Sequence, residues 1–271
     1  MSVDTTVRSE TEPQVRHVTD PAILAQQSCG WTVERWLHVD ARVIYWMTRL
    51  CVVWWLRMGW RLRFYGAEHV PTSGDVLACQ NHSSWLDSWI GAIGHRRIPR
   101  WMGKQEVVNW PVVGWYLRRG GVFPVHRGAG DGAAIDMARL MLEDGQFVLV
   151  YPEGTRIRTS HQLGPARRGA ARLALAAGAT VLPMATYGLK PGTGREYLPR
   201  ALRWLPFARR VTTVYGPPLL VSQEASASAD RIGDVRDQIW EEVTRLYELA
   251  RELTISRRPP ATVKELPSAL H

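Results

Sequence analysis

The chain of 271 residues is long enough for one large domain or two small ones, and it is 45% hydrophobic and 22% charged, which is typical of a globular protein with a buried core. Its formal net charge of +9 favours an anionic partner, such as a membrane surface, nucleic acid or an acidic substrate. The cysteines, Cys29, Cys51 and Cys79, lack C-x-x-C spacing. They support neither a disulfide framework nor a zinc site, and they suit a reducing compartment.

Both ends of the chain are predicted to be loosely attached. Residues 1–30 are polar, lack the apolar stretch of a secretory signal and resemble a flexible arm. Residues 257–271 form a proline-rich sequence that is typical of a flexible tail. We therefore expect the main domain over residues 61–256, and residues 31–60 need a separate explanation.

Residues 31–60 combine tryptophans with an apolar helical pattern that arginines interrupt. The stretch ARVIYWMTRLCVVWWLRMGW, which begins at Ala41, carries Arg42 and Arg49 seven positions apart, nearly on the same face of a helix. An arginine near the centre of a spanning helix is costly, whereas tryptophan and arginine together suit a helix that lies in the bilayer interface. We expect such a membrane-docking helix. The alternative is a core helix packed on the domain.

Predicted strands and helices alternate from residue 61 onward. The strand candidates are RLRFYG, DVLACQ, IPRWMG, GVFPV, QFVLVY, TVLPMA and VTTVYG. Helices are predicted after Trp85, over residues 132–143, from Gly169 and over residues 230–253. This alternation indicates an α/β domain with helices on both faces of the sheet, so functional loop residues should gather along one sheet edge.

The motif QNHSSWLDSW, residues 80–89, places a histidine and an aspartate after a predicted buried strand. His82 and Asp87 would lie about 140° apart around one ideal helix and could not meet within it. They can meet if His82 lies in the turn before the helix and Asp87 in its first turn. A carboxylate that orients a histidine makes it a general base. The alternative is structural, because Ser84-x-x-Asp87 is also a capping-box pattern with Ser84 as N-cap.

Four ordered blocks resemble the glycerolipid acyltransferases typified by 1-acylglycerol-3-phosphate acyltransferase. The first contains the Asn-His-x-x-x-x-Asp form, and the third contains Pro-Glu-Gly-Thr-Arg. The blocks cover residues 64–87, 102–127, 150–158 and 167–185. Together with the flanking sequence, the resemblance extends roughly over residues 64–217.

The resemblance implies a mixed, mostly parallel sheet covered by helices, and an acyl transfer reaction. His82 would act as general base and Asp87 would orient it. The donor would be acyl-CoA or acyl carrier protein, and the preferred acceptor 1-acylglycerol 3-phosphate, giving phosphatidic acid. Another lyso-lipid or a glycolipid is the alternative acceptor. No metal, bound cofactor or nucleic acid is expected. The expected location is the cytoplasmic face of the cell membrane, with peripheral or monotopic attachment to an anionic surface.

Basic residues follow three predicted strands. Each alone reads as a solvated surface charge, but cations on successive strand ends can form one phosphate site. The resemblance assigns phosphate binding to these positions and contact with the acceptor's glycerol part to the Pro-Glu-Gly-Thr-Arg block. The predicted acceptor site comprises Lys104, Arg127, Glu153, Gly154, Thr155 and Arg156. Alternatively, Glu153 pairs with Arg156 as a plain salt bridge.

Two departures from the family pattern leave the acceptor open. Ile157 stands where serine is common, and Ala166 stands where an aromatic residue often precedes a basic pair and glycine. Both positions flank the predicted acceptor site.

Rival functions have weaker support. Gly128-x-Gly130-x-x-Ala133 is a loose dinucleotide fingerprint without a ribose-binding acid, and a flexible loop is the simpler explanation. No G-x-S-x-G motif marks a serine hydrolase. Cys79 is a possible thiol nucleophile, although its place within a strand favours an inert buried thiol. A non-enzymatic protein that binds membrane or nucleic acid would instead spread its arginines over the surface.

Overall fold

The computed structural model describes residues 30–125, 132–157, 162–190, 193–194, 196, 198–202, 209–224 and 226–256. Nearly all of the predicted arm, and the whole predicted tail, lie outside these residues.

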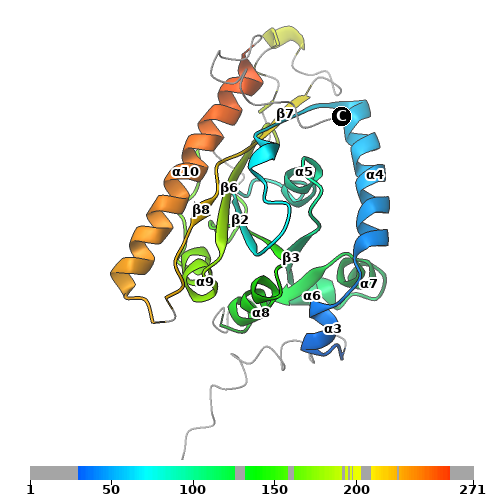
Figure 1. The fold of residues 1–271 in the computed structure, drawn as a ribbon. Coiled ribbons are helices and arrows are strands. Elements are labelled where there is room, and N and C mark those ends of the chain that lie inside the picture. Colours follow the sequence, from blue (N-terminus) through cyan, green and yellow to red (C-terminus); the bar gives the residue numbers. More distant parts are fainter. Residues whose placement is uncertain are drawn as a thin grey trace, which may run out of the picture.

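A mixed sheet forms the centre of the described chain (Figure 1). Its strands are β1 (Trp60–Tyr65), β2 (Val76–Gln80), β3 (Pro99–Lys104), β4 (Val122–Val125), β5 (Phe147–Val150), β6 (Thr180–Tyr187), β7 (Arg209–Tyr215) and β8 (Leu219–Leu220). Their order is β1-β7-β6-β2-β5-β3-β4, and β8 pairs with β6. Strands β6, β2, β5, β3 and β4 run parallel, whereas β7 and β8 are antiparallel to β6. The predicted mixed, mostly parallel sheet is confirmed.

Helices connect the parallel strands and cover the sheet. The α-helices are α3 (Val33–Leu37), α4 (Arg42–Gly59), α5 (Asp87–Ile93), α6 (Gln105–Val108), α7 (Pro111–Arg119), α8 (Gly132–Glu143), α9 (Gly169–Ala177) and α10 (Ala229–Ile255). Short 3-10 turns form η1 (Ala67–His69) and η2 (Arg200–Leu202). Three elements, α6, α7 and β8, were not predicted from the sequence. For α7 a signal was present, since Pro111 occupies its first turn and Gly120 its C-cap.

Alternating side chains on the central strands enter two separate cores. On β2, Val76 and Ala78 pack with α4 and α5, whereas Leu77 and Cys79 pack with α8, α9 and α10. Strand β5 alternates in the same way. Because both faces are covered, these strands read as continuous apolar runs in the sequence.

Parallel pairing brings several strand ends to one edge of the sheet. The residues that follow β2, β5 and β3 lie at this edge because these strands are parallel neighbours. Strand β7 runs the other way, and its last residue, Tyr215, pairs with Met184, which is level with Gln80 at the end of β2. An α/β sheet of this kind binds ligands beyond the carboxyl ends of its parallel strands.

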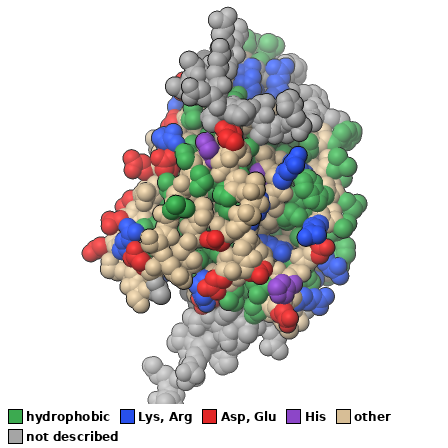
Figure 2. Space-filling model, viewed as in Figure 1, with side chains coloured by type: hydrophobic (Ala, Val, Ile, Leu, Met, Phe, Trp, Pro, Cys, Tyr) green, Lys and Arg blue, Asp and Glu red, His purple; other side chains and the backbone are tan. Residues whose placement is uncertain are grey.

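Residues 31–60 divide into a buried and an exposed part. Trp31 and Trp36 are buried in the core against α8. In α4, by contrast, Trp54 is 64% exposed, and Figure 2 shows hydrophobic side chains along the edge that α4 occupies in Figure 1. The exposed apolar face of α4 comprises Val43, Trp46, Met47, Leu50, Trp54 and Trp55.

The arginines predicted to share one face of this segment have different surroundings. Arg42 is exposed, as expected for a side chain that reaches lipid headgroups. Arg49 is partly buried and hydrogen-bonds to carbonyls of the domain, so the expectation that both lie among headgroups is wrong for Arg49. Among the described residues, no helix is both long and apolar enough to cross a bilayer.

Candidate active site

His82 and Asp87 meet at the carboxyl end of β2. His82 lies in the turn after the strand, and Asp87 is the first residue of α5. The imidazole Nδ1 lies 3.1 Å from Asp87 Oδ2. Asp87 is fully buried, whereas the side chain of His82 is 15% exposed. The structure therefore supplies the arrangement that the sequence required, with a buried carboxylate on one ring nitrogen of a partly exposed imidazole.

Backbone donors hold the Asp87 carboxylate in place. The amides of Ser83 and Ser84 both donate to Oδ2, and the Ser83 hydroxyl donates to Oδ1. These bonds compensate the burial of a charge, which would otherwise be strongly unfavourable. The capping-type bonds predicted for Ser84 are present, since its hydroxyl accepts from the Leu86 amide at 3.3 Å and its amide donates to Asp87, although the residue directly before α5 is Leu86. Asp87 therefore serves the turn and the histidine together, and the structural and catalytic hypotheses do not exclude each other.

Asn81 turns the chain out of the sheet before His82. Its side-chain amide donates to the Thr186 carbonyl, and its side-chain oxygen accepts from the Thr186 amide. The amide side chain thereby takes the place of the next pair of backbone bonds to β6. The backbone of His82 is thus free to bond elsewhere.

Tyr151 stacks on His82 and connects it to α5. The two rings are 3.9 Å apart between centroids and 17° from parallel. The Tyr151 hydroxyl lies 2.7 Å from the Ser88 hydroxyl. Burial, and then the nearby Asp87 charge, raise the pKa of Tyr151 well above its ordinary value, so the phenol stays protonated. Tyr151 and Ser88 were not predicted from the sequence, although an aromatic residue at a strand end beside Pro-Glu-Gly-Thr-Arg was a usable signal.

Glu153 joins three loops beneath the site. Its carboxylate accepts from the His82 amide at 2.6 Å and from the Gly164 amide at 2.8 Å, and the Ile157 amide donates to the His82 carbonyl. Burial raises the pKa of Glu153, and these bonds and the charge of Lys190 oppose that rise. Glu153 therefore stabilises the position of the His82 backbone. The alternative salt bridge between Glu153 and Arg156 does not form in the described chain.

Lys190 places a buried cation behind the site. Its ammonium donates to the Gln162 carbonyl at 2.8 Å and lies 5.7 Å from the centroid of the Tyr247 ring. Burial lowers the pKa of Lys190, and the charges of Glu153 and Asp87 oppose that fall. The sequence analysis did not identify this residue, because it lies beyond the fourth block and no spacing rule connects it to Asp87.

The predicted acceptor residues lie at the same sheet edge, where the structure describes them. Lys104 ends β3, is half exposed and pairs with Glu106 at 3.2 Å. Arg156 is exposed in the turn after β5, and Thr155 beside it is also exposed. Arg127 lies outside the described residues, as do Gly128 and Gly130 of the loose dinucleotide fingerprint.

Gly154 lets the Pro-Glu-Gly-Thr-Arg turn lie close to Arg167. Its φ of +66° is unfavourable for other residues, and an added Cβ would lie 2.8 Å from Arg167 Cδ. The Arg167 amide donates to the Pro152 carbonyl. Arg167 therefore adds an exposed cation next to the turn that carries Arg156. It is the first residue of the fourth block, and the sequence did not assign it to the site.

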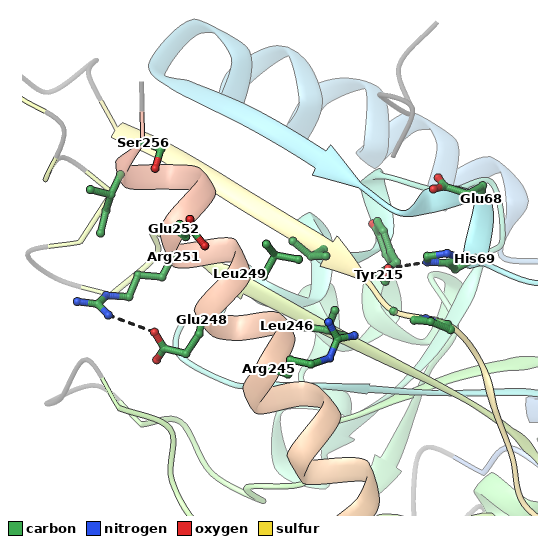
Figure 3. Close-up of a pocket in the computed structure, with 14 residues that line it drawn as sticks. Glu68, His69, Tyr215, Arg245, Leu246, Glu248, Leu249, Arg251, Glu252 and Ser256 are labelled. Atoms are coloured by element: carbon green, nitrogen blue, oxygen red, sulfur yellow. Dashed lines mark hydrogen bonds and ion pairs between the residues drawn. The ribbon is translucent and has the colours of Figure 1, made fainter. Parts of the chain in front are cut away.

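Two other candidates do not combine with this site. Cys79 is fully buried, and burial raises its pKa to about 12, so a thiolate nucleophile is not available there. A groove of about 1170 Å³ lies between α10 and the end of β7 (Figure 3). There His69 donates to the Tyr215 carbonyl, and Arg251 pairs with Glu248. The residues that line this groove include neither His82 nor Asp87, so it is distinct from the candidate active site.

The order of these parts along the chain matches a known family. A family model described as Acyltransferase matches residues 61–187, from β1 to the end of β6, with His82, Asp87 and Glu153 inside the match. Residues 61–187 therefore form an acyltransferase domain.

Curated acyltransferases share this region. A 1-acyl-sn-glycerol-3-phosphate acyltransferase of Bacillus subtilis is 33% identical over 139 residues, which are 50% of this chain and 66% of the relative. One of Pseudomonas aeruginosa is 25% identical over 236 residues, covering 86% and 84% of the two chains. A lyso-ornithine lipid O-acyltransferase of Pseudomonas aeruginosa is 32% identical over 124 residues, covering 43% and 44%.

A solved structure shares the fold of this chain. The crystal structure of PlsC, the 1-acyl-sn-glycerophosphate acyltransferase of Thermotoga maritima, superimposes with a TM-score of 0.55 at 21% identity. The match covers 83% of this chain and 81% of the other. The mixed sheet and its helical layers are thus an arrangement already known in this family.

Behind α5, His95 is a buried base that should make folding sensitive to acid. It packs against the Phe147 and Tyr215 rings, and burial first, then Arg49 and Arg97, lower its pKa to about 3. The unfolded chain binds a proton near pH 6.5 and the folded chain does not, so stability is lost as pH falls from about 6.5 towards 3. Within this window the slope contributed by His95 approaches about 1.4 kcal/mol per pH unit.

We expect His95→Leu to remove this part of the acid sensitivity. Urea unfolding of both proteins at several pH values between 7 and 4.5 measures it. The unfolding free energy of the wild type should fall more steeply than that of the variant. Parallel slopes would contradict the prediction, whatever the absolute stability of the variant.

Proposed function

We propose that this protein transfers a long acyl chain from a thioester donor, acyl-CoA or acyl carrier protein, to the free hydroxyl of a lysophospholipid. The preferred acceptor is 1-acylglycerol 3-phosphate and the product is phosphatidic acid. The observation that carries the proposal is the buried Asp87 carboxylate on Nδ1 of a partly exposed His82. The relatives that act on 1-acylglycerol 3-phosphate support the choice of acceptor.

The geometry supports general-base catalysis at Nε2. Asp87 accepts a hydrogen bond from Nδ1–H, so the free lone pair of the neutral ring is on Nε2. Nε2 takes the proton of the acceptor hydroxyl as its oxygen attacks the thioester carbonyl carbon. The C–S bond then breaks, and the leaving thiolate takes the proton back from the imidazolium. Asp87 stabilises the imidazolium between these steps, and the Tyr151 ring limits rotation of the imidazole.

Cations at the sheet edge support a phosphate-bearing acceptor. Lys104 ends β3 and Arg156 follows β5, so both lie at the sheet edge that carries His82. Arg167 lies against the turn that contains Arg156. Arginine offers two donors to one phosphate group. We include Arg127 in this set from its position in the sequence. Glu153, with both carboxylate oxygens bonded to backbone amides, acts by shaping the site.

A lyso-ornithine lipid is the second candidate acceptor. Relatives named lyso-ornithine lipid O-acyltransferase are 32% and 31% identical over about half of this chain or less. The acyl transfer chemistry would be the same, but the headgroup would present a carboxylate and an amine instead of a phosphate. Comparing turnover of both lyso-lipids under identical conditions decides between them.

The exposed face of α4 supports attachment to one leaflet of a membrane. An acyl chain drawn fully into water costs about 0.8 kcal/mol per methylene, so an enzyme at the interface can receive the chain without that cost. Tryptophans are favoured at headgroup depth, and each basic residue near an anionic surface contributes about 1 kcal/mol. We therefore propose peripheral attachment on the cytoplasmic face through α4.

The first prediction concerns the His82–Asp87 pair. His82→Ala and Asp87→Asn should abolish acyl transfer, because the base is lost or held in the wrong tautomer; a comparable Asp→Asn change in serine proteases costs about 10⁴-fold. Release of free thiol from acyl-CoA measures the rate, and thermal melting checks folding. The exposed His38 gives a control, His38→Ala. If Asp87→Asn keeps near-normal turnover but has a lowered melting temperature, the role of Asp87 is purely structural and the prediction is wrong.

The second prediction concerns the cations. Arg156→Ala, Arg127→Ala and Lys104→Ala should each raise the KM for 1-acylglycerol 3-phosphate about 10- to 100-fold, as expected for a lost charged hydrogen bond of about 1.5–3 kcal/mol. The donor KM should change much less. Arg61→Ala, an exposed arginine on β1, is the control. Equal increases for donor and acceptor would instead indicate binding of the coenzyme A phosphates or a structural role.

The third prediction concerns α4. Replacing Trp46, Leu50 and Trp54 together by serine should weaken binding to anionic vesicles by about tenfold or more, because exposing large apolar side chains costs about 1.5–3 kcal/mol each when burial is complete. Co-sedimentation with liposomes measures this. Leu220→Ser, at an 86% exposed position on β8, is the control. Unchanged vesicle binding of the triple variant would place membrane contact elsewhere.

A further inference from the structure

Side chains from outside α5 bind the carbonyl end of this helix. The last carbonyls of a helix have no partner within it. Here the Tyr215 hydroxyl donates to the Gly91 carbonyl at 2.6 Å, and the Tyr45 hydroxyl donates to the Ala92 carbonyl at 3.1 Å. These bonds are buried, so water does not compete for the carbonyls. Figure 3 shows Tyr215 at the end of β7.

Arg49 supplies the positive charge at this end. Its Nη1 donates to the His95 carbonyl at 2.6 Å and to the Ala92 carbonyl at 3.3 Å. A cation at the C-terminus of a helix is favourable because the carbonyl dipoles point towards it. Arg49 therefore joins α4 to the last turn of α5, at Ala92, and to the turn that follows the helix, at His95.

The same arginine contacts the exposed face of α4. Its guanidinium lies 4.9 Å from the centroid of the Trp46 ring, and Trp46 is 43% exposed. Tyr45 and Arg49 are four positions apart and so lie on one side of α4. Helix α4 thus presents apolar side chains to the outside, and on its inner side Tyr45 and Arg49 bind carbonyls at the end of α5.

The opposite end of α5 carries the candidate catalytic groups. Asp87 is its first residue and contacts His82, and Ser88 bonds the tyrosine that stacks on His82. With about 1.5 Å per residue, this seven-residue helix is about 10 Å long. A short rigid helix that shifts at one end also shifts at the other. A misplacement of about 1 Å at reacting groups can cost about 100-fold in rate.

We propose that Arg49 is a positioning residue, through which the docking helix α4 holds α5 and thereby the His82–Asp87 pair. This inference rests on the proposed function for its catalytic consequence. Its structural part is that Arg49 keeps Asp87 within hydrogen-bonding distance of the turn before α5. This part does not depend on the reaction.

Arg49→Met and Arg49→Lys test the proposal, with Arg96→Met as matched control. Arg96 is exposed and adjacent to His95 in the same turn. Arg49→Met should lower kcat about 10- to 100-fold at unchanged acceptor KM and unchanged binding to anionic vesicles. Arg49→Lys should recover much of the rate, because an ammonium can still donate to the His95 carbonyl. Arg96→Met should behave as the wild type.

Hydrogen exchange provides a readout without turnover. The amides of Ser83 and Ser84 donate to Asp87 Oδ2, so displacement of α5 should expose them. They should exchange faster in Arg49→Met than in the wild type, Arg49→Lys or Arg96→Met. If the wild type shows no acyl transfer to any lyso-lipid, the proposed function fails and the exchange data still decide the role of Arg49.

Three results would overturn the proposal. One is normal turnover and normal exchange in Arg49→Met. Another is lower turnover with unchanged exchange of the Ser83 and Ser84 amides. The third is a loss of vesicle binding at normal exchange, which would make Arg49 a lipid contact. If Arg49→Met does not fold, Tyr45→Phe removes a single donor to the Ala92 carbonyl. It should change kcat and exchange in the same direction but less, and no change in either would also overturn the proposal.

Discussion

The buried carboxylate of Asp87 is the constraint on which the rest of the site depends. A charge without exposure to water needs several donors, and here they come from the Ser83 and Ser84 amides and from His82. Satisfying the charge fixes the turn between β2 and α5 and orients the imidazole at the same time. Because the buried carboxylate needs all of these donors, the imidazole of His82 is held in one orientation, as a general base requires.

Sheet topology supplies the remaining groups around this pair. Because β2, β5 and β3 are parallel neighbours, the chain returns to the same edge after each crossover and brings Tyr151, Glu153 and Lys104 near the turn of His82. Glu153 then bonds the His82 backbone, and Lys190 balances the two buried carboxylates. The site is a set of loops held together by buried charges and backbone amides, and the sheet brings those loops together.

Helix α4 connects the site to the surface. Its outer side is apolar and rich in tryptophan, whereas its inner side contributes Tyr45 and Arg49 to the carbonyl end of α5. From the sequence, Arg42 and Arg49 looked equivalent, since a heptad separates them. They differ because seven residues separate them by about 10 Å along the helix axis, and the carbonyl end of α5 lies beside Arg49.

The sequence by itself determined the α/β class, most strands and the longer helices, because apolar runs and helical periodicity are local properties of the chain. It also identified His82 and Asp87, since an ordered motif after a buried strand restricts where they can lie. It did not identify Tyr151, Ser88, Lys190 or the inward role of Arg49. These residues act through contacts between segments that are distant in sequence. Their partners are set by strand order and helix packing, and those depend on the burial of the whole core.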